Sequence, residues 1–196
     1  MKAIARETFS LEYYLKQEEQ ADFKSEYLDG KIIPMTGGTT NHNQIAVNIT
    51  TELNIALKNL DYRVYMGDVR LWMPEKQIFT YPDIMVIKGS PIYYENRKDT
   101  IVNPTLIIEI LSPSTQSYDR EGKFTAYRNL KSFQEYVLIS QTQIYGEKFV
   151  KTGEKQWSLQ EYYLEDNFIT LELGNVSLKF TDIYHKVDLN DQNGLQ

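Results

Sequence analysis

The longest regular pattern of apolar residues lies between Thr40 and Leu60 and predicts an α-helix. Its apolar positions recur every three or four residues, which places them along one stripe of a helix. They are Ile45, Ile49, Leu53, Ala56, Leu57 and Leu60. The segment follows the helix-breaking pair Gly37-Gly38, and Thr39, Thr40 or Asn41 can cap its first turn.

Shorter patterns predict a hairpin and a series of strands around this helix. Before it, the turn pair Asp29-Gly30 separates Ser25–Leu28 from Lys31–Pro34, which is typical of two antiparallel strands. A short helix, capped by Ser10, is expected from Leu11. After the long helix, apolar runs predict strands at Tyr62–Met66, Val69–Met73, Ile78–Ile87, Thr105–Leu111, Glu135–Gln141, Ile144–Val150, Gln156–Tyr163 and Phe168–Leu173.

The remaining segments predict loops, one more helix and a frayed end. Lys88–Pro104 is polar and contains two prolines, which indicates a loop of about 17 residues. Pro113 ends a strand, and a helix is expected over roughly Tyr118–Leu130. Asp188–Gln196 is expected to fray. No repeat or linker separates these elements, so we expect one α/β domain over residues 1–196, with a core of about residues 10–184.

The two most apolar strands predict a sheet that is buried on both faces. Ile84–Ile87 and Leu106–Ile108 are continuous apolar runs rather than alternating ones. Such runs are typical of strands covered on both sides. The long helix and the helix after Pro113 are the expected covers.

Composition narrows the possible chemistry. The 196 residues contain no cysteine, which excludes disulfides, thiolate zinc sites and cysteine nucleophiles, and two histidines are too few for a multi-histidine metal centre. Without an apolar run near 20 residues or a signal-peptide core in Met1–Ser10, a cytoplasmic protein is expected. The net charge is −6, but seven acidic and two basic residues lie between residues 160 and 196. A nucleic-acid surface therefore stays open for the rest of the chain.

Two acids stand in the two most apolar segments. Asp83 immediately precedes Ile84–Ile87, and Glu109 lies within Thr105–Leu111. A carboxylate at a buried strand is costly unless it is paired or binds a metal. Each acid alone fits a solvated strand end, whereas the pair favours a shared site. Oxygen ligands suit Mg²⁺ or Mn²⁺.

Several segments of the chain resemble segments of the Uma-two family of endonucleases, which have the PD-(D/E)xK nuclease pattern. The strand pair consists of Tyr81-Pro82-Asp83 and the run from Ile108 to Ser114. Further matching segments are Glu26–Ile32, Gly37–Asn43, Asn103–Leu106, Ser112–Thr115, Tyr118–Arg120 and Lys123–Arg128. The resemblance runs from about Ser10 to Tyr184.

This resemblance implies a restriction-endonuclease-like α/β fold, with a central mixed β-sheet flanked by helices and additional C-terminal antiparallel strands. It implies Mg²⁺-dependent hydrolysis of a DNA phosphodiester, with Mn²⁺ as an alternative cofactor. Asp83 and Glu109 would be the metal ligands, with the Ile110 carbonyl as a further candidate, and Glu26 matches an additional acid of the superfamily. A homodimer is expected from the same resemblance.

One position departs from the superfamily pattern. The usual lysine lies two residues after the glutamate, on the same strand face, but Leu111 occupies this position. The resemblance points instead to Lys123 on the following helix, where it shares a face with Tyr127. The expected catalytic set is therefore Glu26, Asp83, Glu109 and Lys123.

Two alternative functions and the role of His42 remain open at this point. Leu111 and the acidic net charge favour a degenerate nuclease fold that acts as a nucleic-acid-binding or regulatory module. A carboxylate–metal hydrolase of small phosphoesters is the second alternative. For His42, a capping or packing role is favoured over catalysis, although the start of its helix could face the site.

Overall fold

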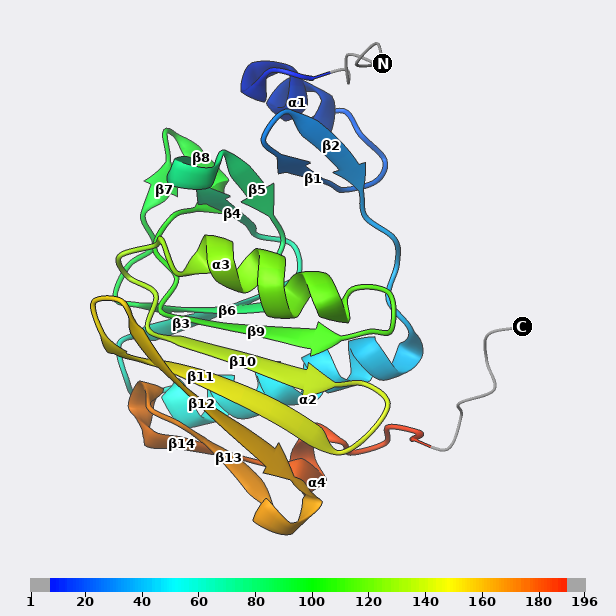
Figure 1. Ribbon diagram of the computed structural model, residues 1–196, viewed down its shortest axis with the longest axis vertical. Coiled ribbons are helices and arrows are strands. Elements are labelled where there is room, and N and C mark those ends of the chain that lie inside the picture. The colour runs from blue at the N-terminus through cyan, green and yellow to red at the C-terminus, as the bar shows by residue number, and fades with distance from the viewer. Residues whose placement is uncertain (1–7, 190–196) are drawn as a thin grey trace, which may run out of the picture.

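The computed structural model describes residues 8–189, and a six-stranded mixed sheet forms its centre (Figure 1). The strand order is β12-β11-β10-β9-β6-β3. The neighbours β9 and β10 are parallel, and every other pair in this sheet is antiparallel. The strands are β3 (Tyr62–Met66), β6 (Ile84–Lys88), β9 (Leu106–Leu111), β10 (Glu135–Ser140), β11 (Tyr145–Gly153) and β12 (Gln156–Tyr163).

Helices cover both faces of this sheet, as its apolar strands predict. On one face the buried side of α2 (Thr40–Leu57) packs against alternate residues of the strands, among them Ile108 and Ile110. On the other face α3 (Phe124–Tyr127) packs against Ile107 and Leu111. In Figure 1 the helix labelled α3 lies on one side of β9 and β10, and α2 lies behind them. Each fully buried aliphatic side chain stabilises this arrangement by roughly 1.5–3 kcal/mol.

A second six-stranded sheet contains the predicted hairpin. Its order is β2-β1-β5-β4-β8-β7. The hairpin strands β1 (Ser25–Leu28) and β2 (Lys31–Pro34) join at Asp29 and Gly30, both with positive φ as the tight turn requires. The other strands are β4 (Arg70–Met73), β5 (Ile78–Thr80), β7 (Tyr93–Tyr94) and β8 (Arg97–Ile101). The preceding helix α1 (Leu11–Glu18) has the predicted Ser10 cap, which accepts a hydrogen bond from the Tyr13 N–H.

Two of the expected element boundaries were wrong. The predicted loop Lys88–Pro104 contains β7 and β8, since backbone pairing with β4 holds this polar segment in a sheet. The predicted single strand Ile78–Ile87 is divided at Tyr81-Pro82-Asp83 into β5 and β6, which belong to different sheets. Proline ends the first strand here because it has no N–H to donate. This division places Asp83 at the start of a central strand.

The helix after Pro113 begins in an unusual form. Residues Tyr118–Lys123 form a π-helix, η2, which continues directly into α3. Single π-turns within α-helices are often found at functional sites.

The last elements form a small antiparallel pair below the central sheet in Figure 1. They are β13 (Phe168–Leu171), β14 (Val176–Lys179) and α4 (Phe180–Ile183). The predicted frayed segment, 188–196, falls mostly outside the described residues. No helix within residues 8–189 combines the length and apolar character needed to cross a membrane.

Candidate active site

Asp83 and Glu109 lie side by side because β6 and β9 are antiparallel. Ile84 pairs with Ile108, so the residue before β6 comes to lie next to Glu109. The Asp83 N–H donates to Glu109 Oε2 at 3.2 Å, and the Ile110 N–H donates to Asp83 Oδ2 at 2.8 Å. Each carboxylate thus accepts a hydrogen bond from the backbone of the other strand, which holds both acids at the same end of the sheet.

Glu109 is the deepest acid of this group. Its Oε1 accepts hydrogen bonds from the Tyr127 hydroxyl at 2.7 Å and from Lys123 Nζ at 3.1 Å. Burial raises the pKa of Glu109, and the nearby carboxylates of Asp83 and Asp119 raise it further, against the lowering effect of Lys123. A buried carboxyl in this position depends on Lys123 for its negative charge.

Lys123 reaches the strand acids from the helix, as the family resemblance implies. Its Nζ lies 3.1 Å from Glu109 Oε1 and 3.1 Å from Asp119 Oδ1. Burial lowers the pKa of Lys123, but Glu109, Asp119, Glu26 and Asp83 outweigh this effect and hold the pKa well above its usual value. This raised pKa keeps Lys123 protonated, which suits a group that stabilises negative charge rather than a base.

The π-helix supplies both Lys123 and the acid Asp119. Asp119 is 2% exposed, so two buried carboxylates lie on either side of one ammonium group. Gly122 belongs to the same turn, and a Cβ at this position would lie 2.5 Å from the ring of Tyr118. The Lys123 ammonium lies 5.9 Å from the centre of that ring. Glycine thus permits the close packing of Tyr118 beside Lys123.

Glu26 comes to the site from the second sheet. It lies on β1 opposite β5 and accepts a hydrogen bond from the Thr80 hydroxyl. It is 8% exposed, and its charge contributes to the raised pKa values of Lys123 and Tyr118. All four predicted catalytic residues are therefore close enough to interact electrostatically.

His42 also faces the site, although the sequence favoured a capping or packing role for it. The helix cap is Thr39, whose hydroxyl accepts a hydrogen bond from the His42 N–H. The imidazole points to Asp83, with Nε2 3.2 Å from Oδ2. Burial lowers the pKa of His42, but the contact with Asp83 outweighs this effect and the pKa is raised. The pKa of Asp83 is lowered, since its contacts with His42, Lys123 and the Ile110 N–H outweigh burial.

Sequence reasoning missed Asp119 and the contact between His42 and Asp83. Asp119, Lys123 and Tyr127 are spaced by four residues, so one helix face carries all three. This spacing was a usable signal for Asp119. The contact of His42 depends on how α2 packs against the sheet, for which the local sequence has no signal.

The donor atoms of the site fit a hard divalent cation. Within residues 8–189, no group of three or more His, Asp or Glu side chains is arranged as a complete metal site. Mg²⁺, however, keeps several waters and commonly uses one or two carboxylates. Asp83 and Glu109 are two adjacent carboxylates, and the Asp83 side chain is 23% exposed, so solvent reaches this end of the pair.

Comparisons with known proteins identify the family of this chain. Residues 11–181 match the model of the Uma2 family, described as "Putative restriction endonuclease". Two similar proteins of Synechocystis sp. are named uncharacterized proteins sll1609 and slr1290. The first is 40% identical over 148 residues, covering 76% of this chain and 84% of the relative. The second is 35% identical over 173 residues, covering 87% of each.

A solved structure shares the fold. A crystal structure from Anabaena variabilis, described as a "putative nuclease belonging to DUF820", matches with a TM-score of 0.73 and 22% identity. The match covers 90% of this chain and 97% of the other. The restriction-endonuclease-like α/β fold is thereby confirmed. Since the family match spans most of the described elements and includes every acid of the site, the chain belongs to the Uma2 family.

Proposed function

We propose that the protein is a divalent-metal-dependent endonuclease that hydrolyses phosphodiester bonds of DNA. The observation that carries this proposal is the cluster of Asp83, Glu109 and Lys123 at one end of the central sheet. Two adjacent carboxylates and a buried lysine are the groups needed to hold a metal ion and to stabilise a phosphoryl transition state. The family match to restriction endonucleases supports the same reaction class.

In this proposal Asp83 and Glu109 hold Mg²⁺, or Mn²⁺ in its place. Such an ion, when bound, polarises a phosphoryl oxygen and lowers the pKa of its water. Lys123 stabilises the negative charge that develops on the phosphoryl group. Glu26 and Asp119 keep Lys123 protonated, and the His42 imidazole orients the Asp83 carboxylate.

The charge balance of the site supports metal dependence. Four acids, Glu26, Asp83, Glu109 and Asp119, act on the one ammonium group of Lys123. A phosphodiester is an anion, and it is repelled by those carboxyl groups of the site that are ionised and not balanced by Lys123 or by His42. A divalent cation removes the repulsion, so the site favours DNA only in its metal-bound form.

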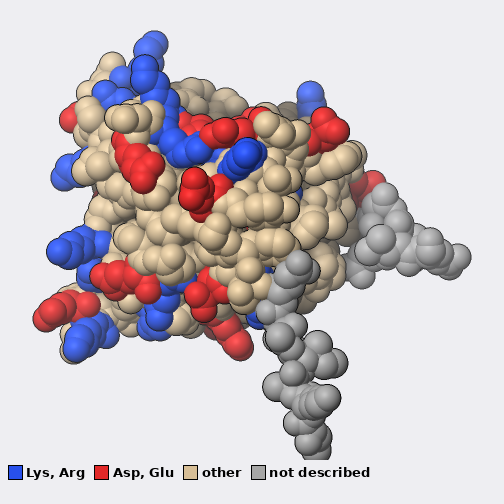
Figure 2. Space-filling model, turned by 90° about the horizontal axis from the view of Figure 1, so that it is seen from above, with Lys and Arg blue, Asp and Glu red and all other residues tan. Residues whose placement is uncertain are grey.

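The outer surface shown in Figure 2 carries both positive and negative side chains. Viewed from the end that carries α1, β1 and β2, Lys and Arg side chains lie beside Asp and Glu side chains around a broad uncharged area. This face therefore offers no broad basic surface to DNA, which favours short-range contacts near the site for binding.

A plasmid-nicking assay with Mg²⁺ or Mn²⁺, and with EDTA, tests the proposal. The wild-type protein should nick the plasmid only with metal. Asp83→Asn should lose the activity while it keeps the fold, since an amide oxygen can still accept the Ile110 hydrogen bond. Asp22→Asn is the matched control, because Asp22 is exposed in the bend before β1.

A second readout measures the metal directly. Mg²⁺ should raise the thermal unfolding midpoint of the wild-type protein and of Asp22→Asn, but not of Asp83→Asn. Wild-type activity in EDTA, or full activity of Asp83→Asn, would contradict the proposal. DNA binding without cleavage would support the alternative of a degenerate binding module, which the Leu111 substitution favours. Cleavage of mononucleotide esters alone would support the small-phosphoester alternative.

A further inference from the structure

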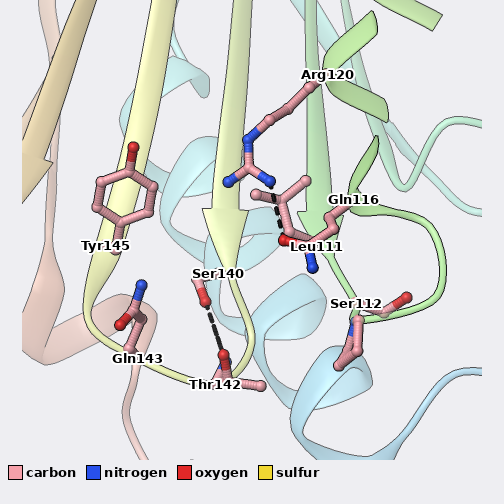
Figure 3. Close-up of a pocket in the computed structure, with 9 residues that line it drawn as sticks. Leu111, Ser112, Gln116, Arg120, Ser140, Thr142, Gln143 and Tyr145 are labelled. Atoms are coloured by element: carbon pink, nitrogen blue, oxygen red, sulfur yellow. Dashed lines mark hydrogen bonds between the residues drawn. The ribbon is translucent and has the colours of Figure 1, made fainter. Parts of the chain in front are cut away.

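A small polar pocket lies beside the candidate active site, and the proposed chemistry leaves it without a role. It has a volume of about 80 Å³ and lies where the parallel strands β9 and β10 end (Figure 3). Its polar lining comes from the segment after β9, from the π-helix and from the turn after β10. These side chains are Ser112, Gln116, Arg120, Ser140, Thr142 and Gln143.

The pocket and Glu109 share one face of the sheet. Leu111 forms part of the pocket wall, and because strand side chains alternate, it points to the same side as Glu109. The two residues are separated by roughly 7 Å along β9. This separation corresponds to about one or two nucleotide steps of a DNA strand. If one phosphate of a DNA strand lies at Glu109, a neighbouring nucleotide of the same DNA strand would therefore lie at the pocket.

The size of the pocket limits which group of a nucleotide can fit into it. Sites for whole small molecules have volumes of roughly 300–1,000 Å³. A volume of about 80 Å³ is too small for a nucleoside. It suits a compact group such as a phosphate.

The lining also has the chemistry of a phosphate contact. Arg, Ser, Thr and Gln side chains are among those that bind backbone phosphates in protein–DNA complexes. Arg120 is held in place by Glu147, 2.8 Å from its Nε, and by Gln116, which accepts from Nη1 at 2.9 Å. Glu147 is a carboxylate, but its contact with Nε and Nη2 of Arg120 offsets its charge. Of the five guanidinium N–H donors, two remain for a ligand.

The turn after β10 adds hydroxyl and amide donors. The Ser140 and Thr142 hydroxyls are hydrogen-bonded to each other at 3.2 Å, so the pair leaves one hydroxyl donor for a ligand. The Gln143 side chain is drawn between Ser140 and Tyr145 in Figure 3. Neutral polar side chains from three segments and one fixed guanidinium thus line the pocket.

We propose that this pocket binds a backbone phosphate of the substrate strand next to the phosphate that is cleaved. The inference rests on the proposed nuclease function and adds a positioning site to it. The pocket sets the register of the strand, so that the scissile phosphate lies at Asp83 and Glu109. Because the contact is to phosphate, it contributes affinity that does not depend on the DNA sequence.

Gln143→Glu tests the pocket by placing a carboxylate beside the phosphate. Gln143 is exposed, so the fold should not change. The KM for a DNA oligonucleotide should rise about tenfold, the scale of a lost hydrogen bond to a charged group, with little change in kcat. Gln134→Glu is the control, since it adds the same charge at the opposite, exposed end of β10.

A set of oligonucleotides with single methylphosphonate linkages locates the contact. Each linkage removes one phosphate charge. The wild-type protein should lose affinity when the neutral linkage lies one or two nucleotides from the cleaved bond. Gln143→Glu should lose little more at this position, because the contact is already gone.

The outcomes separate the two proposals. If the wild-type protein cleaves DNA but Gln143→Glu has the KM of Gln134→Glu, the pocket proposal is wrong and the nuclease function stands. The pocket proposal would also be wrong if the wild-type protein and Gln143→Glu lost the same affinity at every methylphosphonate position. If the wild-type protein neither binds nor cleaves DNA with metal, both proposals fail.

Discussion

Lys123 carries the positive charge that balances the buried acids of the site. It contacts Glu109 and Asp119 at 3.1 Å each, and both of these acids are almost fully buried. The same residue is proposed to stabilise charge on the phosphoryl group. Its substitution therefore affects both the reaction and the stability of the protein, and the two effects can be measured separately.

Lys123→Met should lower the rate of metal-dependent cleavage by about 10²–10³, the usual cost of one lost charge-stabilising donor. Metal affinity should hardly change, since Lys123 is not proposed as a ligand. Single-turnover cleavage at saturating metal measures the rate, and a metal titration measures the affinity. Lys131→Met is the control, because Lys131 is exposed beyond α3. A wild-type rate in Lys123→Met would remove Lys123 from the mechanism.

The stability of Lys123→Met should also depend on pH. Without the ammonium group, Glu109 is a buried carboxyl without its counter-charge, so its pKa, already raised by burial, rises further in the folded state. A carboxyl with a raised folded pKa holds its proton in the folded chain after the unfolded chain has lost it. The variant should therefore lose stability as the pH rises from about 5 to about 8.

Denaturant unfolding of the metal-free protein at these two pH values provides the measurement. The wild-type protein and Lys131→Met should lose less stability over this range, because Lys123 remains charged throughout. Parallel pH dependence of Lys123→Met and the wild-type protein would show that Lys123 does not balance these acids.

At the residue scale, the sequence pointed to candidate site residues more readily than to the contacts between them. Asp83 and Glu109 were recognisable because an acid is unusual in an apolar strand, and Lys123 was recognisable only through its flanking family segment. The contact between His42 and Asp83 joins residues 41 positions apart through the packing of α2 on the sheet. A pairing that is determined by packing leaves no pattern in the local sequence.

Among the elements, the π-helix η2 positions the side chain proposed to stabilise charge on the phosphoryl group. It joins the end of β9 to α3 and contributes Asp119, Arg120 and Lys123. Arg120 points to the pocket and Lys123 to Glu109, so one turn connects the two proposed sites. The geometry of this turn depends on Gly122 beside Tyr118.

Gly122→Ala should destabilise the protein, because the new Cβ would lie 2.5 Å from the Tyr118 ring. Overpacking of this kind costs about 1–3 kcal/mol, against a gain of about 1 kcal/mol from helix propensity. The displaced ring also lies beside Lys123, so the cleavage rate should fall. Chemical denaturation and the nicking assay measure the two effects.

Gly37→Ala is the matched control, since no atom lies within 4 Å of a Cβ there. Its stability should stay within about 0.5 kcal/mol of the wild-type value. If Gly122→Ala is as stable and as active as Gly37→Ala, the close packing of Tyr118 does not hold the turn.

The elements were predictable where one pattern determined them. The predictions of α2 and of the Asp29-Gly30 hairpin were confirmed, because the apolar period of the helix and the turn residues of the hairpin are local signals. The segment Ile78–Ile87 was read as one strand because all its residues suit a strand, yet its halves pair in different sheets. Pairing partners distant in sequence decide such a division, and they also order β7 and β8.

For the whole molecule, residues 8–189 contain one cluster of proposed catalytic residues, so cleavage of both DNA strands would need a second copy of the chain. We therefore expect a homodimer, the commonest symmetric assembly. Light scattering at micromolar concentration should give a mass about twice the 23.0 kDa of the chain. A mass near 23.0 kDa would contradict the prediction and would favour nicking of single strands.

The exchange of hydrogen bonds between Asp83 and Glu109 has an evolutionary consequence. Each acid accepts a backbone N–H of the other strand, so the pair fastens the start of β6 to β9 independently of any reaction. Natural selection for a stable sheet alone would preserve both acids in a descendant that had lost its activity. Among relatives, the loss of Lys123 should therefore mark inactive members earlier than the loss of either acid.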